Sequence, residues 1–257
     1  MNGYRHADVA ALVLAAGQGT RMKSDLAKVL HPMAGRPLLA HVLATLEQLG
    51  VGRTLVVVGH QRERVRELFP SEDLEWVVQA EQRGTGHAVM QAGPALAGFE
   101  GTLLVVCGDT PLLRAETLHR LIEGHQASGA AVTVLSMILP DPTGYGRILR
   151  GEADRIVGIV EHRDATAEQR KIAEVNSAIY AFDYAALAAV LGRLSSHNDQ
   201  GEYYLTDTVA LLLRDGKPTA VVCADDYREL MGINTPEQLT EAEQIYRQLE
   251  SRTRGAS

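Results

Sequence analysis

The amino-acid sequence predicts an α/β fold in which helices flank a mainly parallel sheet. Helical patterns at 37–49, 61–69, 86–97 and 115–127 separate short apolar runs that are rich in Val and Leu. Strands that alternate with helices of this length form right-handed βαβ units, whose strands run parallel. The predicted buried strands of this half of the chain are 9–14, 54–58, 75–78, 102–107 and 131–138.

The helix at 37–49 has the clearest periodicity of these elements. Its leucine and valine residues recur at intervals of three and four, as on the buried face of a helix. Pro37 suits its first turn, and Gly50 suits the stop at its C-terminal end.

The pattern becomes less regular after about residue 140 and predicts a small antiparallel excursion. A capping box at Thr235-Pro236-Glu237-Gln238 predicts that the closing helix begins at residue 236. No flexible linker interrupts the chain, so residues 1–257 are predicted to form a single domain. The remaining predicted elements are strands at 175–182 and 219–223 and a helix near 204–213.

The composition is that of an ordinary globular protein, with 46% apolar and 22% charged residues among 257. The net charge of −7 argues against a protein that binds nucleic acid by neutralising phosphates. No apolar run reaches the ~18 residues of a membrane span. Cys107 and Cys223 offer neither a disulfide framework nor metal-ligand spacing, and both are expected to be small buried residues of a cytoplasmic protein.

The stretch LAAGQGTRMKSDLAKVL at 14–30 leaves the first predicted strand at the edge where α/β sheets bind ligands. Its small residues would let a phosphate or a flat base approach the backbone. Its spacing matches neither the Walker loop nor the dinucleotide fingerprint. Glycines that merely turn the chain remain the alternative. Residues 17–36 also contain four basic side chains, Arg21, Lys23, Lys28 and Arg36, against one acidic side chain, Asp25.

This stretch resembles the signature LAAGxGTRMxSxxxKxL of the sugar-1-phosphate nucleotidylyltransferases. The resemblance continues, in order, through QAEQRGTGHAV, GDTPLL, DPTGYGRI, GIVEHRDAT, EVNSAIY, GEYYLTD and GIN. It is especially clear for the N-terminal uridylyltransferase domain of the bacterial bifunctional N-acetylglucosamine-1-phosphate uridylyltransferase/glucosamine-1-phosphate acetyltransferases. The resemblance implies a Rossmann-like fold of the nucleotide-diphospho-sugar transferase type. It divides the chain into a nucleotide-binding half at about 8–140, a sugar-binding half with the antiparallel excursion at about 141–235, and a C-terminal helix and tail at 236–257.

The resemblance implies residues for the nucleotide. Arg21 and Lys28 would bind the phosphates, and Gln79 would hydrogen-bond the uracil edge. From the residues alone, Gln79 would be an exposed polar residue, because lone glutamines usually are. Contacts with the nucleoside are implied for Leu14, Ala15, Ala16 and Gly17, and close backbone approach for Gly84 and Thr85.

The resemblance also implies Mg²⁺ bound by Asp109 and Asn234. A carboxylate at the end of a buried strand suits this hard ion independently of the resemblance. Asn234 would otherwise be a residue of a helix boundary. For the sugar, the resemblance implies Gly146, Glu161 and Asn176, with Asn234 beside them. From the residues alone, Glu161 and Asn176 would be exposed strand residues. His87 and His162 are expected to have structural roles.

The implied reaction joins UTP and N-acetylglucosamine-1-phosphate into UDP-N-acetylglucosamine and releases pyrophosphate. Gln18 and Cys107 depart from the family pattern, where a lysine and a hydroxyl-bearing residue are usual. No hexapeptide repeat is present, so no β-helix acetyltransferase domain is predicted. The alternatives are another sugar phosphate, dTTP in place of UTP, or a non-catalytic nucleotide-sensing subunit. Neither nucleic acid nor a membrane is an expected partner, and the sequence predicts no oligomeric state.

Overall fold

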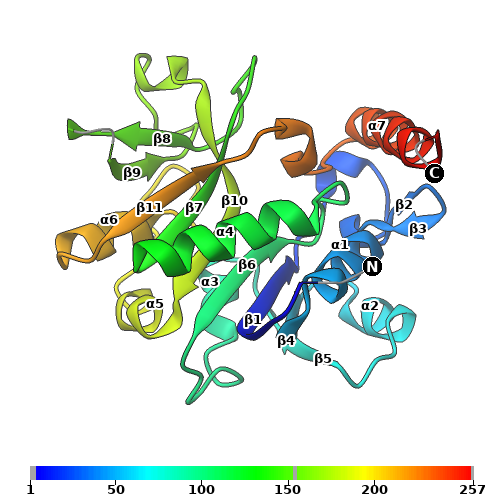
Figure 1. The fold of residues 1–257 in the computed structure, drawn as a ribbon, viewed down its shortest axis with the longest axis horizontal. Helices are drawn as coiled ribbons and strands as arrows, with labels where there is room; N and C mark the ends of the chain where they lie inside the picture. Colours follow the sequence, from blue (N-terminus) through cyan, green and yellow to red (C-terminus); the bar gives the residue numbers. More distant parts are fainter. Residues whose placement is uncertain (1–3, 153–154, 256–257) are drawn as a thin grey trace.

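The computed structural model describes residues 4–152 and 155–255, and its main sheet has nine strands within these ranges (Figure 1). Seven of them follow the order β11-β7-β10-β6-β1-β4-β5. Every neighbouring pair is parallel except those of β10, which runs antiparallel to both β6 and β7. The predicted mainly parallel sheet is confirmed. The strands are β1 (His6–Ala15), β4 (Val51–Val58), β5 (Leu74–Val78), β6 (Thr102–Cys107), β7 (Val132–Ile138), β10 (Glu174–Asp183) and β11 (Thr219–Cys223).

The other two strands of the main sheet form the predicted antiparallel excursion. β8 (Arg147–Arg150) and β9 (Ile156–Val160) pair with each other, and β8 also contacts β10 where Arg147 faces Val175. A separate sheet of two short strands, β2 (Pro32–Met33) and β3 (Arg36–Pro37), was not predicted. Two residues per strand are too few to show an alternating pattern in the sequence.

Helices cover both faces of the sheet. Successive residues of a strand point to opposite faces, so an inner strand such as β1 contributes side chains to two apolar cores. In β1, Val9, Ala11 and Val13 pack into one apolar core, whereas Ala10 and Leu12 pack into the other. The first core contains residues of α1 (Leu38–Leu49), α2 (Arg62–Leu68) and α4 (Ala115–Ser128). The second contains residues of α3 (Thr85–Gln91), α5 (Tyr184–Leu191) and α6 (Asp207–Arg214).

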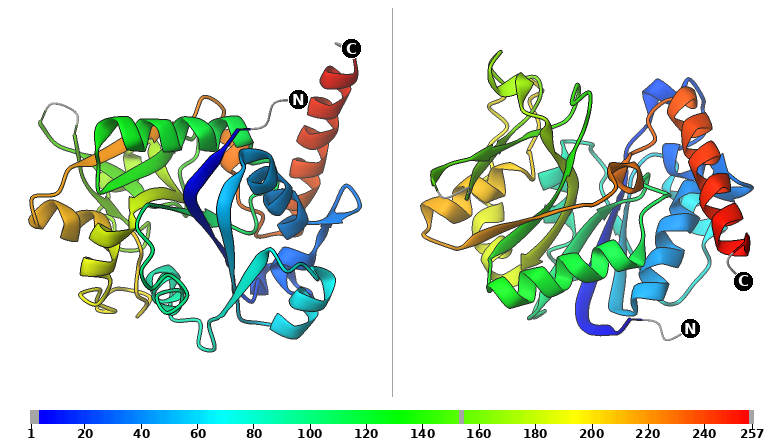
Figure 2. Two further views of the ribbon diagram at one scale, coloured as in Figure 1. Left: turned by 60° about the horizontal axis from the view of Figure 1, so that its bottom comes forward. Right: turned by 45° about the horizontal axis from the view of Figure 1, so that its top comes forward.

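The last helix, α7 (Pro236–Gly255), lies far from α5 and α6 in all views (Figure 2). It packs over β2 with a small core of its own that includes Met33, Ile233 and Ala242. The predicted capping box at its start is confirmed. Thr235 Oγ1 accepts a hydrogen bond from the Gln238 N–H at 3.3 Å, and Gln238 Oε1 accepts one from the Thr235 N–H at 3.2 Å. Short 3₁₀ helices occupy Thr20–Met22, Lys28–Leu30, Gln169–Lys171 and Tyr227–Leu230.

The structure differs from the predictions at some helix ends. Gly50 ends α1 in the left-handed conformation as predicted, but Pro37 precedes the helix with an extended ψ of 147°. The helix predicted at 86–97 ends at Gln91 and continues only as turns, because Pro94 cannot extend a helical hydrogen-bond ladder. Helix α5 was not predicted.

Cys223 is exposed rather than buried, because it ends the edge strand β11. None of the helices among the described residues is long and apolar enough to cross a membrane.

Candidate functional site

The loop after β1 contains two glycines with different physical roles. Gly19 has a positive φ of 69°, and a Cβ at this position would lie 2.6 Å from the Cβ of Lys28. Gly19 therefore allows the Lys28 stem to pack against the loop backbone. A Cβ on Gly17 would meet no protein atom within 4 Å, so this glycine leaves open space beside the backbone. The loop thus positions one cation and keeps its backbone accessible.

A pocket of about 270 Å³ lies at the carboxyl ends of β1, β5 and β6. All seven residues predicted to contact the nucleoside or its base line it, together with Lys28 and Asp109. Arg21, Gly146, Glu161, Asn176 and Asn234 lie outside this lining. The complete lining is Leu14, Ala15, Ala16, Gly17, Lys28, Val29, Gln79, Gln82, Gly84, Thr85, Ala88, Cys107, Asp109 and Glu202.

Gln79 is a buried residue of this pocket, with only 3% of its surface exposed. Its Nε2 donates to the Gly84 carbonyl at 3.1 Å and lies 3.1 Å from Nδ1 of His87. These two contacts fix the orientation of the carboxamide. Among the described residues, its Oε1 accepts no hydrogen bond. The interpretation of Gln79 as an exposed residue is wrong, and the structural role expected for His87 agrees with this contact.

The segment after Gln79 is held by residues of the second half of the chain. Gly84 has a φ of 101°, and a Cβ there would lie 2.7 Å from the Tyr203 carbonyl oxygen. The Gly86 N–H donates to the same oxygen at 2.8 Å. Thr85 Oγ1 accepts from the Leu205 N–H at 3.1 Å. One wall of the pocket is therefore built by both halves of the chain.

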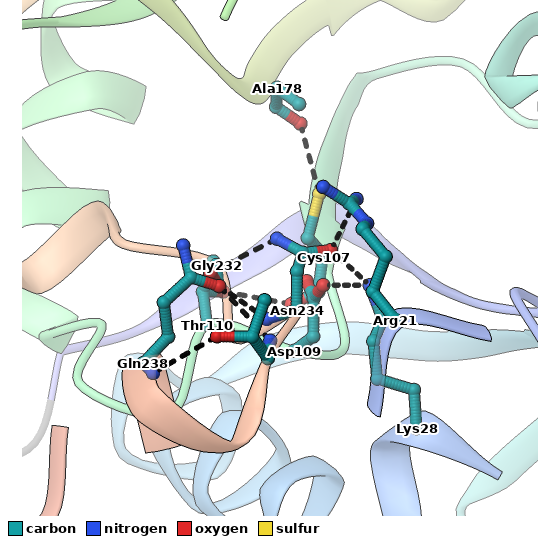
Figure 3. A network of polar contacts seen from close by, with 10 residues as sticks. Arg21, Lys28, Cys107, Asp109, Thr110, Ala178, Gly232, Asn234 and Gln238 are labelled. Carbon is teal, nitrogen blue, oxygen red and sulfur yellow. Dashed lines mark hydrogen bonds and ion pairs between the residues drawn. The ribbon is translucent and has the colours of Figure 1, made fainter. Parts of the chain in front are cut away.

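Four polar side chains from three distant segments converge at the charged end of the site (Figure 3). Lys28 Nζ forms an ion pair with Asp109 Oδ2 and donates to Asn234 Oδ1 at 3.1 Å. Arg21 Nη2 donates to the same amide oxygen at 2.9 Å. The structure thus brings together Arg21, Lys28, Asp109 and Asn234, which the sequence places up to 213 residues apart.

Backbone hydrogen bonds place Asn234 in this network. The Ile233 N–H donates to the Asp109 carbonyl at 2.9 Å and joins the segment before α7 to the end of β6. Gln238 Oε1 accepts from the Asn234 N–H at 2.8 Å, so the capping box of α7 also orients this residue. Asn234 is therefore held beside Asp109 by the chain on both sides of it.

Asp109 and Asn234 present a donor set that fits Mg²⁺. A carboxylate oxygen and an amide oxygen both contact the single ammonium group of Lys28, so the two oxygens already converge on one cation. Mg²⁺ prefers such hard oxygen ligands and is commonly bound by one or two side chains plus phosphates and water. The predicted metal pair is consistent with this geometry.

Glu161 lies in the second half of the chain, beside Gly146. A Cβ on Gly146 would lie 3.4 Å from each carboxylate oxygen of Glu161, so glycine leaves room for the carboxylate. Thr206 Oγ1 donates to Glu161 Oε1 at 3.1 Å. Burial raises the pKa of Glu161 above its ordinary value, and the Thr206 hydrogen bond only partly opposes this shift. Glu161 is thus a partly desolvated carboxylate rather than an ordinary exposed residue.

Asn176 is buried near the start of β10, with 6% of its surface exposed. Its Nδ2 donates to the Tyr180 hydroxyl at 2.7 Å, and its Oδ1 accepts from the Ala178 N–H at 3.0 Å. The Asn176 N–H donates to the Gly146 carbonyl at 2.8 Å. The structure therefore joins Asn176 to Gly146, and the interpretation of Asn176 as an exposed strand residue is wrong.

Sequence reasoning did not assign several residues near the site. Gln82 and Glu202 line the pocket, and Tyr145 lies near enough to Asp109 and Arg21 for both charges to act on its phenol. Burial raises the pKa of Tyr145 above its ordinary value, and the Asp109 charge adds to the shift. The motifs DPTGYGRI and GEYYLTD contain Tyr145 and Glu202, but nothing in either motif selects these side chains over their neighbours.

A larger hollow of about 800 Å³ lies beside the amino-terminal part of β4. Within it, Arg53 and Glu75 form two hydrogen bonds of 2.8 Å with each other, so their charges are already paired. Ligands of α/β sheets bind at the opposite, carboxyl edge of the strands. The smaller pocket therefore remains the candidate site.

Comparison with known proteins agrees with the fold. The family described as the MobA-like NTP transferase domain matches residues 11–173. The chain is 49% identical over 241 residues to the bifunctional protein GlmU of Pelobacter propionicus, covering 93% of this chain and 52% of that protein. It is 52% identical over 242 residues to the bifunctional protein GlmU of Thermobifida fusca, covering 92% of this chain and 50% of that protein. The chain thus spans about half the length of these relatives, and it belongs to the family of MobA-like NTP transferase domains.

Proposed function

We propose that this protein is a uridylyltransferase that forms UDP-N-acetylglucosamine and pyrophosphate from UTP and N-acetylglucosamine-1-phosphate. One observation carries the proposal: a single pocket has an oriented carboxamide, Gln79, and an ammonium–carboxylate pair, Lys28 and Asp109. This combination suits a base and a phosphate chain bound together. The similarity to the bifunctional proteins GlmU supports it.

Gln79 would select the base. Its amide nitrogen contacts the Gly84 carbonyl and Nδ1 of His87, so Oε1 would be the acceptor for a ligand. The imide N–H of uracil is a donor, whereas the corresponding ring nitrogen of cytosine is an acceptor. The close approach of Gly84 to Tyr203 fixes the backbone against which a flat ring would pack.

The proposed chemistry is a direct displacement at phosphorus. An oxygen of the sugar-1-phosphate forms a bond to the α-phosphorus of UTP, and the bond from that phosphorus to the bridging oxygen breaks. Pyrophosphate leaves with the electron pair, and no proton transfer is required. Catalysis then depends on positioning two polyanions and neutralising their charge.

Lys28 and Arg21 would supply the positive charge that neutralises the phosphates of the substrates. A cation about 4 Å from a phosphate oxygen gains ~4 kcal/mol at intermediate dielectric, more than the ~0.3–1 kcal/mol of an exposed helix terminus. Mg²⁺ bound by Asp109 and Asn234 would polarise the phosphate oxygens when present. Asp109 and Asn234 would then contact the metal in place of Lys28 and Arg21.

The sugar would lie beside Gly146, Glu161 and Asn176. A carboxylate accepts hydrogen bonds from sugar hydroxyls, and Glu161 is already partly desolvated. The main-chain bond between Asn176 and Gly146 supports a shared subsite. We further propose a single domain with a nucleotide half at about 8–140, a sugar half at about 141–235 and a C-terminal helix and tail at 236–257. A cytoplasmic location, supported by two free cysteines, belongs to the same proposal.

A matrix of substrates tests the proposal. Pyrophosphate release is measured with UTP, dTTP, CTP and ATP against N-acetylglucosamine-1-phosphate, glucosamine-1-phosphate and glucose-1-phosphate, with and without Mg²⁺. We expect the highest kcat/KM for UTP with N-acetylglucosamine-1-phosphate and no turnover without Mg²⁺. A preference for another pair would identify a different nucleotidylyltransferase. Tight nucleotide binding without turnover on any sugar phosphate would instead indicate a sensing subunit.

A further inference from the structure

Three side chains with metal-binding atoms meet at the amino-terminal end of β1, the end opposite to the nucleotide pocket. His6 is the first residue of β1, and His119 and Glu123 are separated by one turn of α4. One ligand atom from each lies within 4.8 Å of the other two. Residues four apart on a helix share a face, so α4 presents its two ligands toward the same point.

The two imidazoles are spaced as ligands of one ion would be. His6 Nε2 and His119 Nδ1 are 3.0 Å apart. Two nitrogens bound at ~2.1 Å to one ion, with an angle between them of about 90–109°, are separated by roughly 3.0–3.4 Å. Ring rotations, with the proton between the two nitrogens released or moved to the other nitrogen of its ring, would therefore convert the present hydrogen bond between the rings into coordination of a shared ion.

The surroundings hold the two histidines in place. His6 is buried, with 5% of its surface exposed, and its backbone N–H donates to the Gly50 carbonyl at 2.9 Å, which fixes the main chain from which the ring extends. The Tyr4 ring stacks on His119 with 4.3 Å between ring centroids and limits its rotation.

We propose that His6, His119 and Glu123 form a binding site for one divalent transition-metal ion such as Zn²⁺. Two imidazoles and one carboxylate make a common three-residue ligand set for Zn²⁺, and water completes it. Imidazole nitrogen is a poor ligand for Mg²⁺, so this site is chemically distinct from Asp109 and Asn234. Glu123 is exposed, whereas His6 is buried, so an ion would enter from the Glu123 side. The bound ion would fasten the first strand to α4.

Isothermal titration of the full chain with Zn²⁺, in excess Mg²⁺, tests the proposal. We expect one Zn²⁺ per chain in the wild type. His119→Gln and Glu123→Gln should weaken binding by at least the about 10–100-fold that changes near a metal typically cost. Co²⁺ should give the visible absorption of a low-coordinate site in the wild type but not in His119→Gln.

Two control variants separate this site from others on the protein. His197→Asn removes an exposed histidine outside the cluster, and Asp109→Ala removes the proposed Mg²⁺ ligand; both should keep the wild-type isotherm. Circular dichroism checks that the variants fold. Equal Zn²⁺ affinity in wild type, His119→Gln and Glu123→Gln would overturn the proposal, as would loss of binding in Asp109→Ala alone.

Discussion

Lys28 pairs with Asp109 and at the same time donates to Asn234, so one ammonium group lies between the two proposed metal ligands. In the absence of substrate, this lysine neutralises the carboxylate that would otherwise attract a cation. Triphosphate oxygens offer Lys28 an alternative partner. Metal binding and nucleotide binding are therefore expected to be coupled through the movement of one side chain.

Replacing Lys28 with methionine should strengthen divalent-cation binding to the nucleotide-free protein. The variant removes the competing ammonium while it keeps a side chain of similar length. We expect about tenfold tighter Mn²⁺ binding, equal to about 1.4 kcal/mol, together with a loss of turnover. Titration followed by electron paramagnetic resonance measures the affinity. Lys23→Met removes an equal charge from the same loop and should leave the affinity unchanged. Equal Mn²⁺ affinities in Lys28→Met and Lys23→Met would contradict a Lys28 that competes with the metal for Asp109 and Asn234.

Asp109→Ala should remove most turnover without unfolding the protein. Asp109 lies where a carboxylate can bind the metal, and among the described residues it is the carboxylate that pairs with Lys28 beside Asn234. We expect kcat to fall at least about 100-fold, or about 2.7 kcal/mol of transition-state stabilisation. Pyrophosphate release gives the rate, and circular dichroism checks the fold. A near-normal rate in a folded variant would refute the metal assignment.

Gly84→Ala should impair UTP binding and stability together. The added Cβ would meet the Tyr203 carbonyl oxygen at 2.7 Å, and the φ of 101° is unfavourable for alanine. Gly216 also has a positive φ, 70°, but has no atom within 4 Å of an added Cβ. Gly216→Ala should therefore cost only the ~1–2 kcal/mol of the backbone conformation.

Urea unfolding and the KM for UTP distinguish these two variants. Gly84→Ala should lose more stability than Gly216→Ala, and only Gly84→Ala should raise KM. Equal losses of stability and a wild-type KM in both variants would contradict the close packing of Gly84 against Tyr203.

Glu161→Gln should change how stability depends on pH. Because the folded protein binds the Glu161 proton more tightly than the unfolded chain, its contribution to the free energy of unfolding is largest at low pH. This contribution is lost as the pH rises from the ordinary value of 4.5 through the raised pKa of the folded protein. The stability of Glu161→Gln relative to wild type should therefore increase across this interval, while KM for the sugar phosphate rises.

Glu174→Gln provides a control of opposite sign. Burial opposes ionisation of Glu174, but hydrogen bonds from Arg150 and Ser136 outweigh it and lower the pKa. Its carboxylate stabilises the fold above the ordinary pKa, so Glu174→Gln should lose stability relative to wild type as the pH rises. Urea unfolding over a series of pH values measures both variants. If the stabilities of Glu161→Gln and Glu174→Gln changed with pH in the same direction relative to wild type, the assigned pKa shifts would be wrong.

The two cysteines should differ sharply in reactivity. Burial, with the nearby Asp109 charge, raises the pKa of the Cys107 thiol to about 12, whereas Cys223 is exposed. Only about one Cys107 in 10,000 would be a thiolate at pH 8. Reaction with a chromogenic disulfide should give one fast thiol per chain. Cys223→Ser should remove this fast phase and Cys107→Ser should retain it; the reverse result would contradict the assignment.

The elements that could be predicted from the sequence are those whose burial is continuous. Residues 103–107 are apolar throughout because β6 lies in the centre of the sheet with helices on both sides. Helix α5, in contrast, consists mainly of alanine and leucine, which show no polar face. The N-terminal loop was recognised from its small and basic residues. The position of Asn234 beside Asp109 depends on a backbone bond between Ile233 and Asp109, which no local pattern encodes.

The reversed direction of β10 has a consequence for how this fold can vary. β7 ends at Ile138 and the antiparallel β10 begins at Glu174, and these two residues are paired neighbours. The chain between them therefore departs from and returns to the same edge of the sheet, the edge that carries the pocket. A segment anchored in this way can be exchanged, lengthened or shortened without shifting the register of any central strand. If the sugar binds this segment as proposed, the choice of acceptor can change with the segment while the proposed nucleotide half stays constant.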